Sequence, residues 1–347
     1  MFLLTKRRKN AIIFDNDLLK ESIKGYMRKY CVIGNPVGHS KSPQLFERFS
    51  TERGLVYGTN VIYERNEITD AGKLAEFVDE LRRGIWAGCN VTMPWKTDIV
   101  NFMDEISDIA GITGAVNTVS SSRGRLYGDS TDGRGMMNPI KDVMGKERVG
   151  ALVILGCGGA ARSIIAESIL RNTGKLTIVC RGVNTDNGNS LKSNGEQAAL
   201  EKITDAAQFT DSGKQPISGQ GSRVQENKVS NLEITLEMLS RIKKKNTEIV
   251  FVDSSDEEGL QAALDEADVL VNSTPLGMAD GHGNESKLPL QESIRFNKRL
   301  IVADCVYNPD ETLLIKKAKD SGCRIIKGIQ MLEEQARCGV DLLLRTK

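Results

Sequence analysis

The chain has 347 residues, of which 39% are hydrophobic and 27% are charged, so it is long enough for two ordinary globular domains. Its 47 basic and 46 acidic side chains nearly cancel, which argues against nucleic acid or an anionic membrane as a partner. Seven scattered cysteines form no CxxC pair and only two histidines occur, so we expect no disulfide framework and no metal site. No apolar run approaches the ~18 residues of a membrane span, and Met1–Leu4 is too short for the core of a signal peptide. We therefore expect a cytoplasmic protein.

The first half of the chain alternates between strand and helix patterns. After an N-terminal extension at residues 1–28, we predict strands at 30–33, 56–63 and 85–92 and helices at 43–53 and 71–83. Ser42 directly precedes Pro43, which is typical of an N-cap followed by the first helical residue. The alternation indicates an α/β domain before residue 130.

The second half begins with Ala151–Leu155, a continuous apolar run typical of a strand buried on both faces. A helix is predicted at 159–172, and later helices separate further strands at 176–180, 249–252, 269–272, 300–303 and 324–326. This order of elements predicts a doubly wound nucleotide-binding domain.

Residues 182–231 interrupt that domain. Residues 182–194 and 210–231 are rich in Gly, Ser, Asn, Gln and Asp and poor in apolar residues, so they have little surface to bury. We interpret the segment as a flexible insertion with one short helix near 197–207. A surface insertion and a regulatory lid are both compatible with this composition.

The run Gly156–Ala161 fits the pattern GxGxxA between a strand and a helix. Glycine there allows a tight turn and lets the backbone approach a pyrophosphate at the helix N-terminus. The next strand ends at Arg181, where NAD-binding folds usually have an acidic residue for the ribose 2′-hydroxyl. An arginine can instead pair with the 2′-phosphate of NADP. Asp186 nearby leaves NAD open, and Arg181 could also be a plain surface residue.

Lys96 follows Pro94 and Trp95, which would shield it from water. Desolvation depresses the pKa of a lysine toward the working range of a general acid or base. Asp132, if adjacent, would orient the ammonium and keep it charged. Taken singly, a lysine after a strand is usually a surface residue, so the pair becomes informative only together with the nucleotide-binding pattern that follows.

Ser40 and Ser42 place two hydroxyls at the predicted start of a helix. Besides capping, this pair could donate hydrogen bonds to a small carboxylate, which a helix N-terminus favours. The chemistry-bearing residues therefore indicate proton and hydride transfer on a small acidic substrate.

Together these segments resemble shikimate dehydrogenase, from Tyr30 to about Leu344 without the insertion. The motifs of that family occur in order, at Gly34–Pro36 with His39–Pro43, Asn90–Lys96, Gly114–Thr118, Ser130–Gly133, Gly156–Ala161, Asn272–Met278, Asp304–Pro309, and Met331-Leu332 with Gln335-Ala336. The resemblance implies an oxidoreductase that reversibly reduces 3-dehydroshikimate to shikimate with NADPH, in the biosynthesis of aromatic amino acids. NAD is the alternative cofactor.

The resemblance also implies a two-domain α/β architecture. Residues 29–131 and 328–347 would form the substrate-binding domain, and residues 132–327 a Rossmann-type NADP-binding domain. The active site would lie in the cleft between them, and closure would exclude water. The protein would be a monomer or a homodimer.

By the same resemblance, Lys96 and Asp132 form the catalytic pair. Implied substrate ligands are Ser40 and Ser42 for the carboxylate, Tyr307 near it, and Thr92, Asn117 and Gln335 for the ring hydroxyls. Implied cofactor-binding residues are Gly156, Gly158, Gly159, Ala160, Arg181, Thr274, Gly328 and Met331.

The chain departs from the family pattern at two places. Cys180-Arg181-Gly182 stands where the family usually has Asn-Arg followed by Thr or Ser, and Gln330 replaces a glycine before the Met-Leu pair. A quinate/shikimate dehydrogenase that uses NAD or NADP, and a non-catalytic NADP-binding paralogue, are the alternatives.

Overall fold

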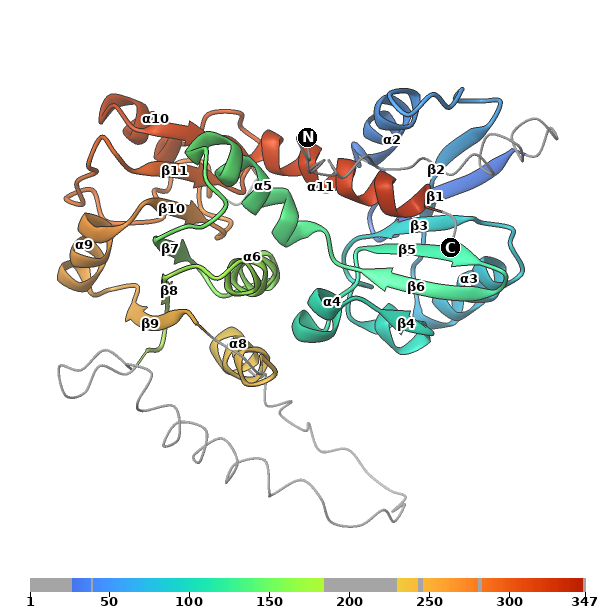
Figure 1. Ribbon diagram of the computed structural model, residues 1–347, viewed down its shortest axis with the longest axis horizontal. Coiled ribbons are helices and arrows are strands. Elements are labelled where there is room, and N and C mark those ends of the chain that lie inside the picture. Colours follow the sequence, from blue (N-terminus) through green and yellow to red (C-terminus); the bar gives the residue numbers. More distant parts are fainter. Residues whose placement is uncertain (1–26, 39, 184–229, 243–245, 280–282, 346–347) are drawn as a thin grey trace, which may run out of the picture. The chain divides into compact units, whose positions relative to one another are not determined.

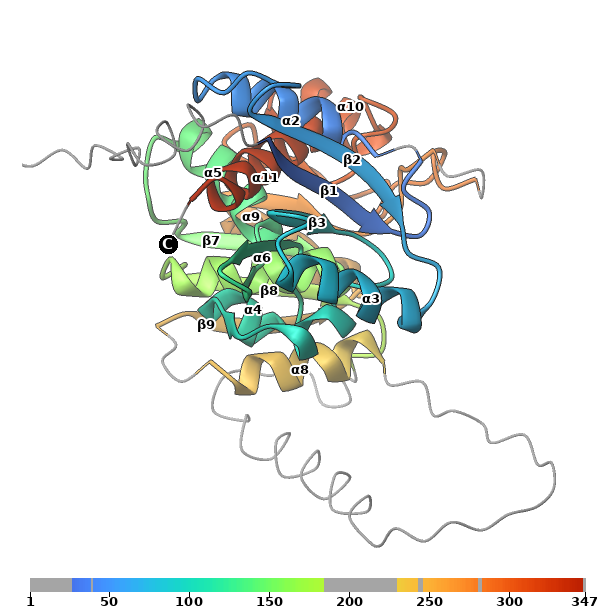
Figure 2. The same ribbon diagram turned by 90° about the vertical axis from the view of Figure 1, so that its right-hand side faces the viewer.

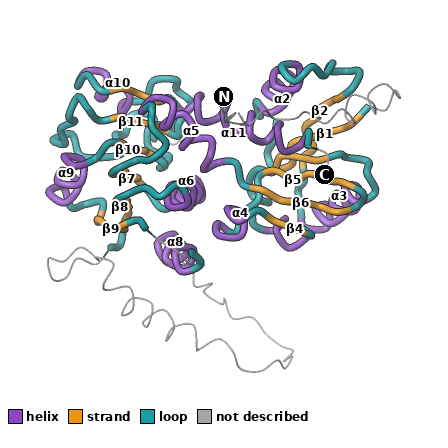
Figure 3. Tube along the Cα trace, in the orientation of Figure 1, coloured by secondary structure: helices purple, strands orange, loops and turns teal. Residues whose placement is uncertain are grey.

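The computed structural model describes residues 27–38, 40–183, 230–242, 246–279 and 283–345 (Figure 1). His39, most of the predicted extension and insertion, and the short helix predicted at 197–207 lie outside these residues. The chain divides into two compact units. Unit 1 comprises Met1–Ser107, Ala115–Asp129 and Ala336–Lys347, and unit 2 comprises Asp108–Gly114 and Ser130–Gln335. Each unit has its own sheet, as the strands of Figure 3 show, and the α/β fold class is confirmed.

The sheet of unit 1 has six strands in the order β2-β1-β3-β5-β6-β4. β1 pairs in parallel with β2 and β3, β5 runs antiparallel to both β3 and β6, and β4 pairs in parallel with β6. The strands are β1 (Arg28–Gly34), β2 (Val61–Glu67), β3 (Gly88–Val91), β4 (Glu105–Ile106), β5 (Thr118–Ser122) and β6 (Arg125–Asp129).

Two amphipathic helices pack on this sheet. α2 (Ser42–Thr51) buries Leu45, Phe46 and Phe49 and lies beside β1 and β2 (Figure 2). α3 (Ala71–Arg82) buries an apolar stripe and begins at Asp70, whose side chain accepts a hydrogen bond from the backbone of Lys73. The predicted helix at 71–83 is therefore confirmed to within one residue.

Three predictions for unit 1 are wrong in detail. Ser42 is not the N-cap of α2, because it is the first helical residue and Lys41 precedes it without a side-chain cap. The strand predicted at 56–63 begins only at Val61, since residues 56–60 form a turn in which Asn60 Oδ1 accepts from the Val56 amide. The strand predicted at 85–92 is limited to Gly88–Val91.

The hairpin of β5 and β6 was not predicted. Its two-residue loop, Arg123 and Gly124, has φ values of 50° and 79°. Both are in the left-handed region that the tight hairpin turns require. Gly124 could have indicated the turn, but the polar composition of β5 did not predict a strand.

The sheet of unit 2 is parallel throughout, in the order β12-β11-β10-β7-β8-β9. Its strands are β7 (Ala151–Leu155), β8 (Lys175–Cys180), β9 (Glu248–Asp253), β10 (Val269–Asn272), β11 (Ile301–Asp304) and β12 (Arg324–Ile326). The chain order reverses at β7, between β8 and β10. This is the doubly wound topology that the sequence predicted, and its strand positions agree to within one residue at each end.

Helices cover both faces of this parallel sheet, as its apolar strands require. Alternate residues of β7 belong to different cores, with Leu152 and Ile154 on one side and Val153 and Leu155 on the other. The first core includes α5 (Asp132–Met144), α6 (Gly159–Leu170) and α8 (Asn231–Ser240). The second includes α9 (Glu257–Glu266) and α10 (Leu313–Asp320).

The remaining elements are η1 (Asp98–Phe102), α4 (Asp108–Thr113) and α11 (Gly328–Leu343). The boundary between the units divides α11, whose residues from Ala336 onward belong to unit 1. There a Cβ at Gly88 would lie 2.6 Å from Leu343, so the absence of a side chain lets the helix approach β3. None of the helices in the described part of the chain is long and apolar enough to cross a membrane.

Candidate active site

Ser40 and Ser42 of unit 1 lie together at the start of α2. The hydroxyl of Ser40 donates to Oγ of Ser42 at 3.0 Å, and the Ser42 amide donates to Oγ of Ser40 at 3.2 Å. Arg65 of β2 holds the Ser40 carbonyl oxygen through Nη2 at 2.6 Å. The two hydroxyls are thus positioned near the N-terminus of a ten-residue helix, where an anion is favoured.

A polar network continues from Ser42 across the sheet of unit 1. Tyr63 is fully buried, its hydroxyl interacts with Ser42, and it donates to Oδ1 of Asn90 at 2.7 Å. Asn90 Nδ2 donates to Thr118 Oγ1 at 3.0 Å, and that hydroxyl donates to Asn117 Oδ1 at 3.0 Å. Burial raises the pKa of Tyr63 well above its usual range, so it remains a neutral hydrogen-bond donor.

This network connects two of the predicted substrate ligands, Ser42 and Asn117, through three residues to which the sequence analysis gave no role. Tyr63, Asn90 and Thr118 lie on β2, β3 and β5, and Asn90 is the first residue of a motif already quoted. The sequence signal for Tyr63 was a tyrosine followed by polar residues in a predicted strand. Only the strand order brings the three side chains together.

Thr92 and Lys96 lie on the turn that follows β3. The backbone amide of Thr92 donates to Ile33 O at 2.9 Å, and the carbonyl oxygen of Lys96 accepts from Val116 at 2.8 Å. Gly34 is required here, because a Cβ would lie 2.3 Å from Thr92 Cγ2. Both ends of the turn are therefore fixed to the sheet, and Thr92 and Lys96 are half-buried.

Trp95 anchors the same turn. Its indole is 9% exposed and donates from Nε1 to the Ile68 carbonyl oxygen at 2.8 Å. Pro94 is exposed, whereas Lys96 is half-buried. Trp95 thus acts as the anchor of the loop that carries Lys96.

Asp132 of unit 2 is the first residue of α5, where the helix dipole favours a carboxylate. Two glycines follow it, and each allows a neighbouring helix to approach. A Cβ at Gly133 would lie 2.3 Å from the carbonyl oxygen of Ser163 on α6. A Cβ at Gly135 would lie 2.7 Å from Cβ of Gln335 on α11. Asp132 therefore begins a helix that packs directly against the predicted ligand Gln335.

Tyr307 and Gly328 also meet within unit 2. Gly328 begins α11, and a Cβ there would lie 2.3 Å from the Val306 carbonyl oxygen and 2.7 Å from the Tyr307 amide. Met331, one turn further along α11, is 9% exposed and packs against the core that includes α5. The structure thus gathers Asp132, Tyr307, Gly328, Met331 and Gln335 beyond the carboxyl ends of β11 and β12.

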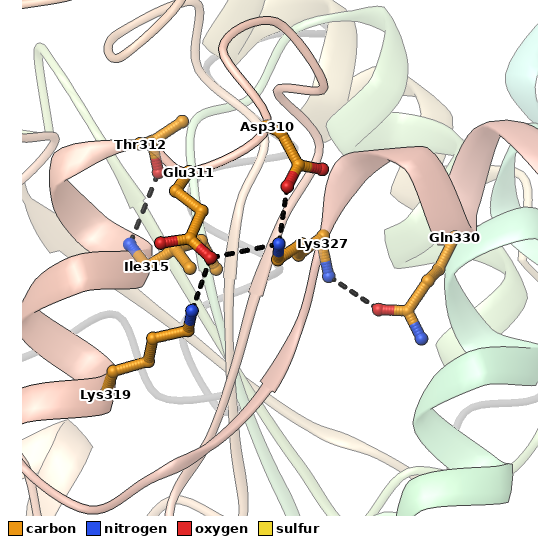
Figure 4. Close-up of polar contacts among 7 residues, drawn as sticks. All are labelled: Asp310, Glu311, Thr312, Ile315, Lys319, Lys327 and Gln330. Atoms are coloured by element: carbon orange, nitrogen blue, oxygen red, sulfur yellow. Dashed lines mark hydrogen bonds and ion pairs between the residues drawn. The ribbon is translucent and has the colours of Figure 1, made fainter.

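Ion pairs fix the loop after β11 to the start of α11 (Figure 4). The Lys327 ammonium bonds to Asp310 and to Glu311, the latter at 3.1 Å, and Glu311 also pairs with Lys319. Hydrogen bonds from Lys319 and Lys327 lower the pKa of Glu311 to about 2. Gln330 Oε1 accepts from the Lys327 amide at 2.8 Å, so the residue that departs from the family pattern satisfies a backbone donor at this helix start.

Asp304, the last residue of β11, is buried and fully hydrogen-bonded. Its Oδ1 accepts from Asn272 Nδ2 and the Val306 amide, both at 2.9 Å, and its Oδ2 accepts from Thr312 Oγ1 at 2.6 Å. Burial raises the pKa of Asp304 to about 6 despite these hydrogen bonds. Asn272 Oδ1 in turn accepts from the amide and hydroxyl of Thr274. The predicted cofactor residue Thr274 is thus held by a buried side-chain network.

The glycine turn lies where the order of the unit 2 sheet reverses. Gly156 follows β7 with φ +100°, and a Cβ there would lie 3.1 Å from Thr274 Cγ2. A Cβ at Gly158 would meet no atom within 4 Å, and α6 begins at the next residue. Open space beside the N-terminus of a twelve-residue helix fits a dinucleotide pyrophosphate, which needs backbone N–H groups and no side chain in its path. Gly159 and Ala160 supply the first of these amides.

Arg181 is exposed directly after β8. Gly182 follows with φ +83°, and Asp253 at the end of β9 accepts hydrogen bonds from the amides of Gly182 and Val183 at 3.0 and 3.1 Å. The pKa of Asp253 is lowered, mainly by a hydrogen bond from the Ser255 side chain. The turn that presents Arg181 is therefore fixed from the neighbouring strand, and its guanidinium suits a phosphate.

The predicted residues form groups within each unit. Unit 1 contains Ser40, Ser42, Thr92, Lys96 and Asn117, and unit 2 contains Asp132, Tyr307, Gln335 and all the predicted cofactor residues. The predicted catalytic pair therefore takes Lys96 from one unit and Asp132 from the other.

Known proteins match both the first part of the chain and nearly its whole length. The family model of the shikimate dehydrogenase substrate binding domain matches residues 32–119. The NADP(+) shikimate dehydrogenase of Streptococcus pneumoniae strain ATCC 700669 is 31% identical over 316 residues, which is 90% of each chain. The chain belongs to the shikimate dehydrogenase family. The resemblance drawn from the motifs is thereby confirmed.

Solved structures of shikimate dehydrogenases share the fold. The enzyme of Listeria monocytogenes, in complex with shikimate and NAD, is 25% identical with a TM-score of 0.71, over 92% of this chain and 93% of that one. The enzyme of Thermus thermophilus, in complex with NADP(H) and shikimate, is 25% identical with a TM-score of 0.62, over 91% and 93%. Both cofactors thus occur among these shikimate dehydrogenases.

Proposed function

We propose that the chain is a shikimate dehydrogenase that interconverts shikimate and 3-dehydroshikimate with NADP. The relationship to NADP(+) shikimate dehydrogenases over 90% of the chain carries this conclusion. The polar network of unit 1 and the glycine turn of unit 2 support it, because each supplies one half of what the reaction needs. The function belongs to the biosynthesis of aromatic amino acids.

We propose that residues 29–131 with 328–347 form the substrate-binding domain and residues 132–327 the cofactor-binding domain. The division into unit 1 and unit 2 supports this assignment except at residues 108–114, 130–131 and 328–335, which belong to unit 2. The cytoplasm is the proposed location, which seven free cysteines support. Monomer and homodimer are the two proposed states.

In unit 1, the hydroxyls of Ser40 and Ser42 bind the substrate carboxylate, and Thr92 and Asn117 bind ring hydroxyls. Tyr63 and Asn90 orient this set, since their hydrogen bonds link Ser42 to Thr118 and so to Asn117. Pre-oriented polar groups reject a ring that lacks the matching hydroxyl, because their own hydrogen bonds would be left unmade. In unit 2, Gln335 binds a further hydroxyl and Tyr307 lies at the carboxylate end.

Bound NADP supplies the hydride chemistry, and the residues described above at the ends of β7, β8 and β10 would hold it. Lys96 moves the proton: its Nζ protonates the oxygen of 3-dehydroshikimate that becomes a hydroxyl, and it takes that proton back when shikimate is oxidised. Asp132 orients the Lys96 ammonium. Arg181 pairs with the 2′-phosphate.

Initial rates with shikimate and with quinate, each with NADP and with NAD, test the proposal. We expect the highest kcat/KM for shikimate with NADP. Arg181→Ala should weaken NADP binding about ten- to hundredfold, as expected for the loss of a charge-assisted contact, and leave NAD binding nearly unchanged. Arg299→Ala, an exposed arginine elsewhere in unit 2, is the matched control. Preference for quinate would make the chain a quinate/shikimate dehydrogenase, and NADP binding without turnover would make it a non-catalytic paralogue.

A further inference from the structure

Two cysteines lie side by side at the glycine turn. β7 and β8 pair in parallel with Leu155 opposite Val179, and the Gly156 amide donates to the Val179 carbonyl oxygen at 2.7 Å. Cys180 ends β8 and Cys157 is the next residue of the turn after Gly156, so the register brings them to adjacent strand ends. Cys157 packs against the core to which Cys180 belongs, and the Cys180 thiol donates a hydrogen bond to the sulfur of Cys157.

The charged groups around this pair make the two sulfurs unequal. The hydrogen bond from Cys180 lowers the pKa of Cys157 to about 7, and the cations of Arg162 on α6 and Arg181 after β8 act in the same direction. The same hydrogen bond raises the pKa of Cys180, and Asp253 on β9 adds to that effect. Of the two thiols, Cys157 is therefore the one that ionises more readily near neutral pH, and Cys180 is the one that keeps its proton.

A second cysteine pair in the chain shows what this environment adds. Cys31 of β1 and Cys89 of β3 are direct partners in the register of unit 1, and neither is exposed. Burial raises the pKa of both thiols, and no cation appears among the causes. By contrast Cys157 is half-buried. Proximity is common to both pairs, whereas access and positive charge belong to Cys157 alone.

We propose that Cys157 and Cys180 are a redox-sensitive dithiol, which a low-molecular-weight disulfide oxidises to an intramolecular cross-link that weakens dinucleotide binding. The effect on binding rests on the proposed function, whereas the cross-link itself does not. The departure of Cys180 from the family pattern is what completes the pair.

The chemistry balances as two thiol–disulfide exchanges. The Cys157 thiolate attacks one sulfur of oxidised glutathione, forms a mixed disulfide and releases one glutathione thiolate. Cys157 is then no longer an anion that accepts the Cys180 proton, so the main cause that raised the pKa of Cys180 is removed. Cys180 loses its proton to solvent and attacks the Cys157 sulfur, releasing the second glutathione. Two protein thiols are oxidised and one external disulfide is reduced.

The turn can accommodate this change because glycine flanks Cys157 on both sides, while Cys180 is fixed within β8. Forming the bond shortens the distance between the sulfurs to about 2.05 Å and draws the turn toward β8. The amides at the start of α6 then no longer keep the arrangement that suits a pyrophosphate.

The test uses the full reduced chain treated with oxidised glutathione. Free thiols are alkylated, the protein is digested without reductant, and peptide masses are determined. We expect a peptide that joins Cys157 to Cys180, while Cys31 and Cys89 in the same digest are alkylated only after denaturation. The dissociation constant of NADP, measured by calorimetry, should rise about tenfold, as for one lost charge-assisted contact, and recover with dithiothreitol.

Variants separate the steps. Cys180→Ser should accumulate the mixed disulfide on Cys157, and in Cys157→Ser the NADP affinity should not respond to the oxidant. Cys323→Ser, at another half-buried cysteine, should oxidise like the unaltered chain. Free Cys157 after treatment, or its pairing with another cysteine, would overturn the site. A Cys157–Cys180 cross-link with unchanged NADP affinity would overturn the effect on binding. Mass mapping requires no turnover, so a failure of the proposed function is recognised separately.

Discussion

The proposed site of unit 1 consists mainly of side chains, whereas the proposed pyrophosphate site of unit 2 consists mainly of backbone groups. In unit 1, hydrogen bonds connect the side chains from Ser40 through Tyr63 and Asn90 to Asn117. These bonds orient the side chains before any ligand binds. In unit 2 the pyrophosphate site is mainly backbone, with Gly156 and Gly158 keeping space free before α6. On the proposed function, selectivity for a small ring would depend on side-chain chemistry, whereas binding of the pyrophosphate would depend on where side chains are absent.

The largest effect is expected at Lys96, which tests whether the two functions separate by unit. Lys96→Ala should lower kcat by about 10²- to 10⁴-fold, the usual contribution of a general acid or base. NADP affinity should stay within twofold or so, because all predicted cofactor residues lie in unit 2. Steady-state rates and a binding titration check the two parts, and Lys29→Ala, an exposed lysine on β1, is the control. Near-normal turnover in the variant would end the catalytic assignment.

Unit 2 also relies on a buried carboxyl side chain, that of Asp304, whose contribution to stability should depend on pH. Its pKa in the folded chain, about 6, exceeds the ordinary 3.8, so the folded state holds a proton that the unfolded state releases. The stabilisation is complete below the ordinary pKa and is lost as pH rises through about 6. With a shift of about two units, this amounts to about 3 kcal/mol.

The measurement is urea unfolding from pH 4.5 to 7, compared with Asp304→Asn. Glu311 does not contribute to the slope there, because its lowered pKa acts only below the ordinary value of 4.5. The unaltered chain should lose stability relative to the variant as pH rises, since asparagine cannot ionise. Parallel pH curves for the two proteins would show that Asp304 does not titrate in this range.

Two glycines of unit 2 should respond differently to the same substitution, one mainly in stability and the other mainly in NADP binding. Gly133→Ala should destabilise the chain by about 1–3 kcal/mol, because the new Cβ meets the backbone of Ser163 on α6. Gly158→Ala should cost less than about 1 kcal/mol, the difference between glycine and alanine at an N-cap, since its Cβ meets nothing. It should nevertheless weaken NADP binding. Unfolding curves with NADP titrations check both, and unchanged binding in Gly158→Ala would place the pyrophosphate elsewhere.

The parallel sheet of unit 2 was predictable almost residue by residue. Its strands are largely apolar runs such as Ala151–Leu155, which lies between Gly150 and Gly156, so local pattern and tertiary burial agree. The strands of unit 1 were harder to predict because about half of their residues are polar. Thr118–Ser122 contains three serines, although it pairs with both β3 and β6. The strand after α2 begins five residues later than predicted because Asn60 stabilises a turn.

The candidate site shows the same contrast. Motifs identified Ser40, Lys96 and the glycine turn, since each has a local chemical signature. Tyr63 lies in no motif, and Thr118 only ends the motif Gly114–Thr118. Their importance arises from strand order, which places residues from β2, β3 and β5 in one network. The Cys157–Cys180 contact likewise depends on register between two strands.

The smallest effect is expected at Tyr63, and it tests whether the unit 1 network orients the substrate ligands. Tyr63→Phe keeps the ring contact with Phe46, whose centroid lies 4.6 Å away, but removes the hydrogen bonds to Ser42 and Asn90. Stability should fall by about 1 kcal/mol. KM for shikimate should rise severalfold while KM for NADP stays unchanged. Tyr57→Phe is the matched control, because among the described residues its hydroxyl bonds only to the Tyr63 backbone. It should cost similar stability without changing KM. Equal kinetic effects of the two variants would mean that the network stabilises the sheet and does not orient the ligands.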